Sequence, residues 1–448
     1  MDVPWSGRRL HFVGIGGAGM SGLALVAQAL GADVSGSDRS VTGSTAQRLR
    51  EAGIEPRDGH DATHVPADAE VVYSTAIAAE NPERTTGAAE LHRAALLGEL
   101  TRLKPTIAVS GTHGKTTTSS MLVHALTAIG ADPSYLVGGE VRSTGTNAAW
   151  GAGEWLVVEA DESDRSLLEL HPRIAVVTNA ELDHETTYSS LRDVLDTFRR
   201  FVARADHAVV WDRPELRALC TATPGTVYDV PEPRLDARGS RFEVGGHAVV
   251  LTVPGAHNAL NAAAALTAIA VAGLDVAGAA TGLESFTGAG RRFERLGRTA
   301  GGADVVDDYA HHPTEVAATL AASRTLDPRR VVAVFQPHLF SRTRRHARAF
   351  GQALAAADEI VVTGIYAARE RQEDFPGVTG RLIAASAADH AGGRPVAWLP
   401  DLAEAERHLR ATLRAGDLCL TMGAGDVDAL GRALVEVGDP APAPNTDP

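Results

Sequence analysis

The sequence predicts an α/β protein with several parallel sheets. Short Val/Ile-rich runs alternate with alanine-rich helical patterns almost from end to end, which is typical of strand-helix-strand units. In three places, at residues 10–13, 106–110 and 304–306, such a strand runs into a segment rich in Gly, Asp or His. At 448 residues the chain is too long for one ordinary core. We therefore expect three domains, each with its own loop at a strand end.

Composition narrows the classes of function. The formal net charge is −14 at pH 7, and the chain has no lysine-rich or arginine-rich run, which argues against a nucleic-acid partner. Cys220 and Cys419 form neither a CxxC pair nor a dense framework, so we expect buried thiols in a reducing compartment. No stretch approaches the roughly 20 apolar residues of a membrane span, and the N-terminus lacks a signal-peptide core. These features favour a cytoplasmic protein without membrane contact.

A glycine-rich turn after the first strand predicts a site for a pyrophosphate group. Its GxGxxG spacing is formed by Gly14, Gly16 and Gly19. Asp38 ends the next strand, where its carboxylate can accept hydrogen bonds from ribose hydroxyls. Taken alone, these residues favour NAD as the ligand, with a purely structural turn as the alternative. Ser74 and Thr75 follow the strand 70–73 and either contact the same phosphates or form a polar turn.

A second glycine-rich segment, Gly-Thr-His-Gly-Lys-Thr, predicts a nucleoside triphosphate site after the strand 106–110. Gly111 and Gly114 let the backbone approach phosphate oxygens, and a helix that starts near Thr116 directs free N–H groups at them. Lys115 adds positive charge, and the Thr116 hydroxyl is placed to bind Mg²⁺. The first glycine of the usual P-loop is missing, so this is a compact variant. A chance match is the alternative, which the strand before the loop and the helix after it disfavour.

Acidic side chains follow the next two strands of the same region. The strand 155–158 runs into four acids within six residues, and the strand 174–178 runs into a segment that contains His184. Carboxyl ends of neighbouring parallel strands converge on one crevice, so these groups can reach a cation beside Thr116. Glu159 is the preferred ligand, and an imidazole ligand such as His184 suggests a site that also admits Mn²⁺. Solvated acids are the alternative, although four neighbouring carboxylates repel one another without a cation.

The second half of the chain carries weaker signals. Asn258 either contacts an adenine edge or caps a helix, and Arg292 either reaches a γ-phosphate or is one of a solvated arginine pair. Residues 307–315 and 335–343 follow strands and gather polar groups that favour substrate contact over metal binding. Residues 423–426 form either a further contact or a turn without function.

The expected domain boundaries lie at Lys104-Pro105, where proline interrupts a helical pattern, and near Leu296, where glycines end an alanine-rich region. The resulting domains are residues 1–104, 105–296 and 297–437. The proline-rich tail 438–448 is expected to be disordered.

Seven motifs occur in an order that resembles the Mur ligase family. They are Gly-Ile-Gly-Gly-Ala-Gly-Met-Ser-Gly, Gly-Thr-His-Gly-Lys-Thr-Thr-Thr, Glu-Ala-Asp-Glu-Ser-Asp, His-Asn-Ala-Leu-Asn, Gly-Arg-Arg-Phe, Asp-Asp-Tyr-Ala-His-His-Pro-Thr-Glu and Phe-Gln-Pro-His-Leu-Phe-Ser-Arg-Thr. The matches extend over about residues 10–426. The resemblance implies a Rossmann-like N-terminal domain, a central P-loop ATPase domain and a Rossmann-like C-terminal domain. In this family the first glycine loop holds UDP, so NAD becomes the second choice.

The resemblance also implies an activity. The implied activity is that of an ATP-dependent ligase, which joins L-alanine to the lactyl carboxylate of UDP-N-acetylmuramate through an acyl phosphate, in peptidoglycan precursor synthesis. The implied cofactors are ATP and Mg²⁺, and the chain acts as a monomer or homodimer. Three rivals stay open: a sister ligase that attaches a whole tripeptide, an NAD-dependent oxidoreductase and a nonenzymatic nucleotide-binding module.

Site residues follow from the resemblance position by position. Those for the UDP-sugar are Gly14, Gly16, Gly17, Gly19, Met20, Asp38, Ser74 and Thr75. Those for ATP are Gly111, Thr112, His113, Gly114, Lys115, Thr116, Thr117, Asn258, Arg292 and Asp308. Those for the metal are Thr116, Glu159 and His184, with Lys115 and His184 as catalytic positions. Those on the acyl and amino-acid side are Tyr309, His312, His338 and Arg342.

Two positions depart from the family pattern. Thr186 stands where relatives usually carry aspartate two residues after the metal histidine, and Ala95 stands where they usually carry glutamate. The detail of the second metal shell and of some substrate contacts can therefore differ in this chain.

Overall fold

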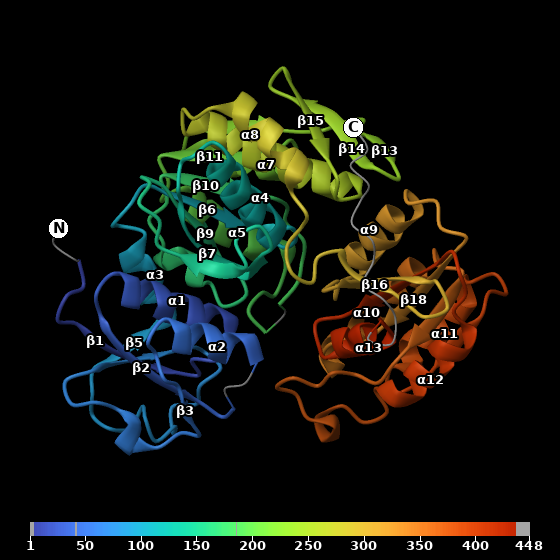
Figure 1. Cartoon of the computed structure of the whole chain (residues 1–448), viewed down its shortest axis with the longest axis horizontal. Coiled ribbons are helices and arrows are strands. Elements are labelled where there is room, and N and C mark those ends of the chain that lie inside the picture. Colours follow the sequence, from blue (N-terminus) through green and yellow to red (C-terminus); the bar gives the residue numbers. More distant parts are fainter. Residues whose placement is uncertain (1–3, 41–42, 185, 436–448) are drawn as a thin grey trace. The chain divides into compact units, whose positions relative to one another are not determined.

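The computed structural model describes residues 4–40, 43–184 and 186–435 (Figure 1). The chain divides into two compact units. One comprises Met1–Glu232, Phe242–Val250 and Leu260–Phe286, and the other comprises Pro233–Arg241, Leu251–Ala259 and Thr287–Pro448. Four sheets alternate with helices along the chain, which confirms the predicted α/β class. The tail predicted to be disordered, residues 438–448, lies outside the described residues.

The N-terminal part of the first unit is built on a parallel sheet of order β3-β2-β1-β4-β5. The central strand β1 is buried after its first residue, so it carries the apolar run that the sequence predicted. The strands are β1 (Arg9–Val13), β2 (Asp33–Asp38), β3 (Arg57–Asp58), β4 (Glu70–Tyr73) and β5 (Glu90–His92). The helices are α1 (Ala18–Ala29), α2 (Gly43–Glu51), the short η1 (Ala62–His64) and α3 (Arg93–Leu100).

The central part of the first unit has a sheet of order β12-β11-β10-β6-β9-β7-β8, in which only the β7 and β8 pair is antiparallel. Its strands are β6 (Thr106–Ser110), β7 (Ser134–Val141), β8 (Thr146–Ala149), β9 (Leu156–Glu159), β10 (Ile174–Val177), β11 (His207–Trp211) and β12 (Gly225–Tyr228). The intervening helices are α4 (Lys115–Ala128), η2 (Ser166–Glu169), α5 (Leu191–Val202), α6 (Pro214–Arg217) and η3 (Ala218–Thr221). Further along the chain come α7 (Ala256–Val271), α8 (Val276–Gly282) and η4 (Leu283–Ser285).

The position of β6 explains where a ligand can bind. All five of its residues are buried, as expected for the middle of a parallel sheet with both faces covered. The chain leaves β6 toward β7 on one side and returns through β9 to β10 on the other. Such a switch in strand order opens a crevice at the carboxyl ends of the strands, where doubly wound sheets bind ligands.

The second unit contains a sheet of order β16-β17-β21-β18-β19-β20, parallel except for β16. Its strands are β16 (Glu294–Arg298), β17 (Asp304–Asp308), β18 (Arg330–Phe335), β19 (Glu359–Val362), β20 (Val396–Trp398) and β21 (Asp417–Met422). One core joins the sheet to α9 (Pro313–Arg324), α10 (Phe340–Leu354) and α11 (Arg381–His390). The other core joins the sheet to α12 (Leu402–Thr412) and α13 (Val427–Val435). The short η5 (Gln372–Asp374) precedes α11.

Two details correct the expectations about this region. The strand predicted at residues 304–306 extends to Asp308, so Asp307 and Asp308 lie on β17 and not in the loop after it. The boundary predicted near Leu296 falls inside β16, which pairs with β17 and so belongs to the third large sheet. The boundaries of the three domains otherwise stay predictions.

A small sheet of order β13-β14-β15 is formed by β13 (Arg234–Asp236), β14 (Gly239–Val244) and β15 (His247–Leu251).

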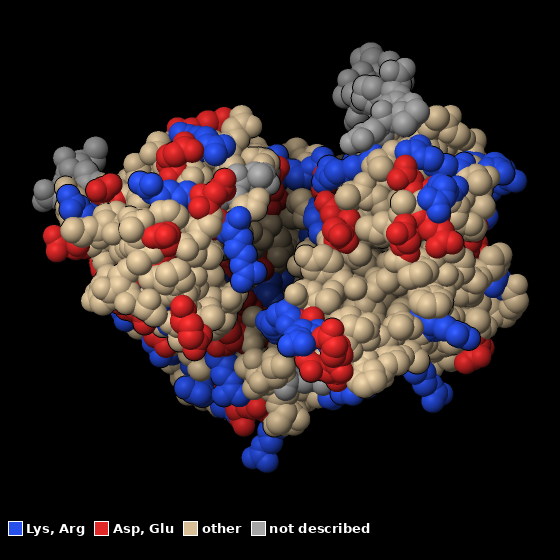
Figure 2. All heavy atoms as spheres, turned by 90° about the horizontal axis from the view of Figure 1, so that it is seen from below, with Lys and Arg blue, Asp and Glu red and all other residues tan. Residues whose placement is uncertain are grey.

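Charged side chains of both signs lie on the surface (Figure 2). On the face shown in Figure 2, Lys and Arg side chains are interspersed with Asp and Glu side chains. None of the helices within the described ranges combines the length and apolar character that crossing a membrane requires. Cys419 is buried in the core of the second unit, as expected, whereas Cys220 is only half-buried.

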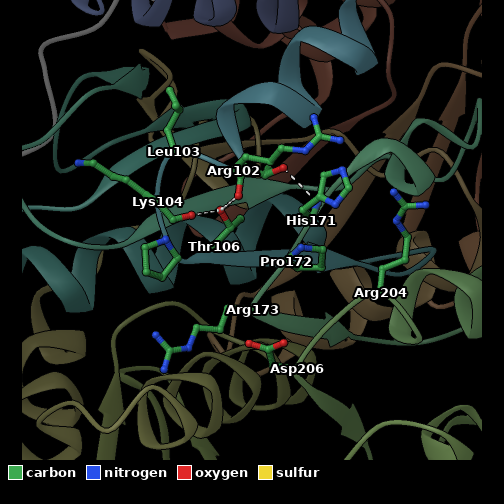
Figure 3. A pocket seen from close by; sticks show the side chains of 11 residues that line it. Arg102, Leu103, Lys104, Thr106, His171, Pro172, Arg173, Arg204 and Asp206 are labelled. Atoms are coloured by element: carbon green, nitrogen blue, oxygen red, sulfur yellow. Dashed lines mark hydrogen bonds between the residues drawn. The ribbon is translucent and has the colours of Figure 1, made fainter. Parts of the chain in front are cut away.

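A cavity of about 410 Å³ lies at the amino ends of β6 and β10, away from the strand ends that face the crevice (Figure 3). Arg102 follows the C-terminus of α3 and Arg204 follows that of α5, where a cation offsets the partial negative charge of the last carbonyl groups. Lys104 Nζ donates to the carbonyl oxygens of Gly151 and Gly153, each at 2.7 Å. The basic lining is therefore explained by packing and helix ends, without an anionic ligand.

Candidate active site

The segment between β6 and α4 has the geometry of a phosphate-binding loop. Gly111 has φ +131°, and an added Cβ there would collide with the hydroxyl of Thr178. Gly114 has φ +81° and immediately precedes α4, and an added Cβ would lie 2.5 Å from Asn261 Oδ1. Only glycine is compatible with both positions. The first free N–H groups of a 14-residue helix therefore open directly onto the loop.

The loop is fastened to the segment that follows β10. Thr178 Oγ1 donates to the carbonyl oxygen of His113 at 2.6 Å. The amide of Asn179 binds His113 twice, accepting from its N–H at 2.9 Å and donating to its carbonyl at 3.0 Å. Thr112 exchanges hydrogen bonds with the backbone of Glu181 at 3.1 and 2.9 Å. These bonds hold the loop in shape before any ligand arrives, which is the preorganisation that phosphate transfer requires.

Lys115 lies at the centre of this arrangement. Its Nζ donates to the carbonyl oxygens of Gly111 and Thr112 at 2.7 and 3.2 Å and pairs with Glu162 at 2.8 Å. Burial alone would lower the pKa of Lys115, but the charges of Glu162 and Asp161 raise that pKa above its usual range. The lysine is therefore a fixed positive charge at the mouth of the loop.

Thr116 and Glu159 present two oxygens that suit a divalent cation. Thr116 Oγ1 lies 3.0 Å from Glu159 Oε1, and the backbone N–H of Gly138 donates to Glu159 Oε2 at 2.6 Å. In an octahedral Mg²⁺ site with bonds of about 2.1 Å, neighbouring ligand oxygens lie about 3 Å apart. The spacing and the hard oxygen donors therefore fit Mg²⁺.

His184 reaches the loop through a residue that sequence reasoning did not single out. Its Nε2 lies 3.5 Å from Glu162 Oε1, the carboxylate that also pairs with Lys115. The Glu162 side chain is 2% exposed, and the hydroxyl of Tyr188 donates to its carbonyl oxygen at 2.6 Å. Among four acids within six residues, sequence alone could not tell that Glu162 is the one turned inward. The structure makes Glu162 the link between the lysine and His184.

The first glycine loop is held by the end of β2. The N–H groups of Gly14 and Ile15 both donate to the carbonyl oxygen of Ser37, at 2.8 and 2.9 Å. The N–H of Gly16 donates to Asp38 Oδ2 at 2.9 Å. Asp38, expected to accept from ribose hydroxyls, thus already uses one oxygen to shape the loop. Gly17 is the residue before α1, whose N-terminus faces the loop in the same way as that of α4.

Three other residues were expected around the first loop, and the structure buries the side chain of one of them, Met20. Met20 is 5% exposed and packs in the core. Its side chain therefore cannot contact a ligand, and only its backbone, in the first turn of α1, can do so. Ser74 and Thr75 follow β4, the strand beside β1, and the Ile77 side chain from the same turn lies 3.2 Å from where a Cβ of Gly14 would be. This position agrees with the expectation that the 74–75 segment lies near the loop.

Arg93 was missed by sequence reasoning. Its Nη1 approaches within 3.6 Å of where a Cβ of Gly19 would lie, and its Nη2 pairs with Asp161 and Asp164 at 3.4 and 3.0 Å. Within the first unit, this guanidinium stands between the first glycine loop and the acids that follow β9. The signal available in the sequence was a single arginine at the start of a helix, which is too common to interpret.

In the second unit, the three positions expected to serve ATP contact neighbouring groups of the same unit. Asn258 Nδ2 donates to the carbonyl oxygen of Pro254 at 2.7 Å within the first turn of α7. Asp308 accepts from the N–H groups of Phe293 and Ala310, and burial raises its pKa to about 6. The Arg292 guanidinium lies 5.0 Å from the centre of the Tyr309 ring.

The neighbouring Arg291 explains a loop whose role the sequence left open. Its Nε pairs with Asp307 at 2.9 Å, and its two terminal nitrogens donate to the carbonyl oxygens of Gly425 and Gly423. Arg291 thereby fixes the 423–426 turn beside the end of β17. This supports the structural interpretation of that turn.

The residues expected on the acyl and amino-acid side gather at the carboxyl ends of β17 and β18. His338 stacks on Tyr366 with ring centres 6.0 Å apart, and Arg342 Nη1 lies 3.3 Å from His338 Nδ1. Tyr309 contacts His311 edge-on at 5.3 Å, and His312 begins α9 as its N-cap. His311, part of the 307–315 segment, also belongs to this cluster. Tyr366 was missed, because it does not stand out from the residues around it in the sequence.

Family models cover most of the chain in three consecutive parts. Residues 9–104 match the model described as Mur ligase family, catalytic domain. Residues 109–269 match the Mur ligase middle domain, and residues 291–425 match the Mur ligase, glutamate ligase domain. The order agrees with the three-domain arrangement expected from the motifs.

Individual relatives agree with the family models. The UDP-N-acetylmuramate–L-alanine ligase of Acidithiobacillus ferrooxidans is 44% identical over 457 residues, covering 94% of this chain and 96% of the relative. The crystal structure of the UDP-N-acetylmuramate-alanine ligase of Thermotoga maritima superposes with a TM-score of 0.81 at 29% identity, covering 96% and 98% of the two chains. A murein peptide ligase from Psychrobacter arcticus shares the fold, with a TM-score of 0.70 at 24% identity and coverage of 96% and 98%.

Proposed function

Because the chain belongs to the Mur ligase family, we propose that it is an ATP-dependent ligase that joins L-alanine to the lactyl carboxylate of UDP-N-acetylmuramate. The products are UDP-N-acetylmuramoyl-L-alanine, ADP and phosphate, and the reaction serves peptidoglycan precursor synthesis. The observation that carries the proposal is the preformed phosphate loop, with Lys115 and a carboxylate-bearing strand end beside it, in a chain 44% identical to such a ligase.

The reaction has two steps that both develop negative charge. A carboxylate oxygen of the sugar attacks the γ-phosphorus of ATP, the bond to the bridging oxygen breaks, and ADP leaves an acyl phosphate behind. The amine of L-alanine then attacks the acyl carbon, loses a proton, and phosphate departs as the amide forms. Lys115 and the N–H groups of the loop stabilise the transferring phosphoryl group. No protein nucleophile is needed.

Magnesium binding is part of the proposal. Thr116 and Glu159 would hold the ion, whose charge offsets that of the phosphate oxygens during transfer. We propose that His184, whose Nε2 lies 3.5 Å from Glu162 Oε1, also serves as a ligand at this metal site, and that Mn²⁺ is also accepted.

The first glycine loop is proposed to hold the UDP part of the sugar substrate. Gly14, Gly16, Gly17 and Gly19 would face the diphosphate, with the start of α1 supplying N–H groups. The second carboxylate oxygen of Asp38 and the 74–75 segment would complete the contacts with UDP. Met20 contributes only through its backbone, because its side chain is buried.

Residues of the second unit are proposed to serve the rest of the reaction. Asn258, Arg292 and Asp308 would lie on the ATP side, the last mainly by shaping the turn that carries Phe293 and Ala310. Tyr309, His312, His338 and Arg342 would face the acyl group and the amino acid. Consumption of ATP and a UDP-sugar fits a cytoplasmic enzyme. We propose that it acts as a monomer or homodimer.

One assay tests the proposal against its rivals. The purified protein is incubated with ATP, Mg²⁺ and UDP-N-acetylmuramate, and phosphate release is compared with L-alanine, glycine, L-serine or the tripeptide. We expect release that depends on both sugar and amino acid and is fastest with L-alanine. Faster release with the tripeptide would instead identify the sister activity, and release independent of any amine would contradict a ligase. Because one methyl group contributes only about 1 to 3 kcal/mol to discrimination between two substrates, partial activity with glycine is compatible with the proposal.

A further inference from the structure

A buried carboxylate surrounded by imidazoles lies behind the first glycine loop, outside the groups assigned above. Glu83, in the long connection between β4 and β5, has a side chain that is 0% exposed. Its Oε1 lies 3.0 Å from His64 Nδ1 and accepts from the N–H of Asp61 at 3.3 Å. Its Oε2 lies 3.2 Å from His60 Nδ1.

Two groups from the sheet itself complete the cluster. Ser37 Oγ, on β2, donates to Glu83 Oε2 at 2.5 Å and also lies 3.0 Å from His60 Nδ1. His11, on β1, is fully buried with its Nε2 3.7 Å from Glu83 Oε2, while its Nδ1 lies 2.9 Å from Ser35 Oγ. The carboxylate thus collects donors from β1, β2, η1 and the turn before η1.

The cluster keeps Glu83 ionised. Burial by itself would raise the pKa of Glu83, but the nearby His11 ring and the hydrogen bond from Ser37 lower that pKa to about 2. Apolar side chains of similar volume would stabilise a fold at least as well as a buried ionic group does. The cluster therefore calls for an explanation beyond stability, and its position supplies one.

Ser37 connects the cluster to the glycine loop. Its hydroxyl donates to Glu83, while its carbonyl oxygen accepts from the N–H groups of Gly14 and Ile15. The next residue, Asp38, accepts from the N–H of Gly16. The two residues that end β2 therefore fix three consecutive N–H groups of the loop, and Glu83 fixes the first of these two residues.

We propose that Glu83 is a positioning residue for the nucleotide part of the sugar substrate, acting through Ser37 on the Gly14–Gly17 loop. This inference rests on the proposed function of that loop as the UDP site. Loss of the carboxylate frees the end of β2 to shift, and a loop displaced by a fraction of an ångström binds the diphosphate less well. The phosphate-transfer site at Lys115 has its own supports after β10 and is not affected.

The first test is Glu83→Gln, with Glu80→Gln as the matched control because Glu80 is an exposed acid three residues away. We expect Glu83→Gln to raise KM for UDP-N-acetylmuramate about tenfold while kcat and KM for ATP stay within about twofold. Glu80→Gln should change none of these. A merely structural role would lower the apparent kcat through the amount of folded enzyme and leave both KM values unchanged, and that pattern would overturn the proposal.

A second variant keeps the test decisive if Glu83→Gln does not fold. Ser37→Ala removes the hydroxyl that links Glu83 to β2 but retains the carbonyl that holds Gly14 and Ile15. We expect the same selective rise in KM for the sugar, smaller in size. The double variant Glu83→Gln/Ser37→Ala should be no worse than Glu83→Gln alone, because both changes break one pathway. Full additivity of the two effects would contradict the pathway.

Calorimetric titration with UDP separates this inference from the proposed function. If the wild-type protein binds UDP and Glu83→Gln binds it about tenfold more weakly, both stand. If the wild-type protein binds UDP and the variant binds it equally well, only the role of Glu83 fails. If the wild-type protein does not bind UDP, the assignment of the loop fails, and the inference about Glu83 falls with it.

Discussion

The two glycine loops of the first unit share one architecture and differ in what lies behind them. Each leaves a buried parallel strand and leads into a helix N-terminus. Behind the 111–114 loop, the buried Glu162 pairs with Lys115, and oxygens of Thr116 and Glu159 lie alongside. Behind the 14–17 loop, the buried Glu83 binds imidazoles and a serine hydroxyl. We therefore propose that the same backbone frame serves phosphate transfer where a lysine points into it, and substrate binding where a buried carboxylate supports the loop from behind.

The largest expected effect comes from removing that cation. Lys115→Ala should lower kcat by at least about a hundredfold, because the lysine acts on charge that develops in the transition state. Binding of UDP at the other loop should be unchanged, which calorimetry checks on the same preparation. Weakened UDP binding with near-normal turnover would reverse the roles assigned to the two loops.

Glu162→Gln should have the next largest effect. It leaves the partly buried Lys115 without its buried carboxylate partner, and breaking such an ion pair costs up to about 3 to 5 kcal/mol of unfolding free energy. We expect a lower unfolding midpoint in urea and a fall in kcat of about tenfold or more. Glu154→Gln, an exposed acid just before β9, is the control and should match the wild-type protein. A variant as stable as the wild-type protein would show that Glu162 does not support the lysine.

The third prediction uses pH to probe the other buried glutamate. The pKa of Glu83 is about 2 in the folded protein against about 4.5 as its ordinary value. A depressed carboxyl pKa contributes stability that is complete above about pH 4.5 and is lost as pH falls toward 2, up to about 3 kcal/mol. The unfolding free energy of Glu83→Gln should therefore approach that of the wild-type protein as pH falls from 5 to 3. A difference between the two that stays constant over this range would contradict an ionised Glu83.

The smallest effect is expected at Asp38, the residue that follows Ser37 and holds the N–H of Gly16. Asp38→Asn keeps an oxygen for the N–H of Gly16 but removes the charge that a ribose hydroxyl would meet. We expect KM for the UDP-sugar to rise about threefold to tenfold, equivalent to roughly 1 kcal/mol, with kcat unchanged. Asp33→Asn, at the other end of β2, serves as the control. An equal rise in KM for ATP would show that the change is not confined to this loop.

Local pattern was enough to predict much of this arrangement. The strand at residues 106–110, the helix that follows and the first glycine loop lie where the sequence indicated, because strand and helix periodicities and glycine spacing are local properties. The partners were not predictable in this way. Thr178 and Asn179 meet His113 across more than 60 residues, and Glu162 meets Lys115 across 47. Only the order of strands in the sheet decides such pairs.

Polar motifs were also harder to interpret than their composition suggested. Arg291 and Arg292 are identical in type and adjacent, and their guanidinium groups lie 5.1 and 5.0 Å from the centre of the Tyr309 ring, yet only Arg291 also binds Asp307 and two carbonyl groups. Asp308, which is expected on the ATP side, accepts two backbone N–H groups. A buried polar group must satisfy its hydrogen bonds first, and the sequence does not reveal which neighbours will do so.

The scarcity of lysine gives the Lys115 site a practical property. The whole chain contains only two lysines, Lys104 and Lys115. Burial lowers the pKa of Lys104, whose ammonium is enclosed by carbonyl oxygens, whereas nearby carboxylates raise the pKa of Lys115. Amine-directed acylation of the folded protein therefore has two chemically distinct side-chain targets on opposite ends of β6. Peptide mapping of the label can report nucleotide occupancy at one of them, with the other as an internal standard within the same molecule.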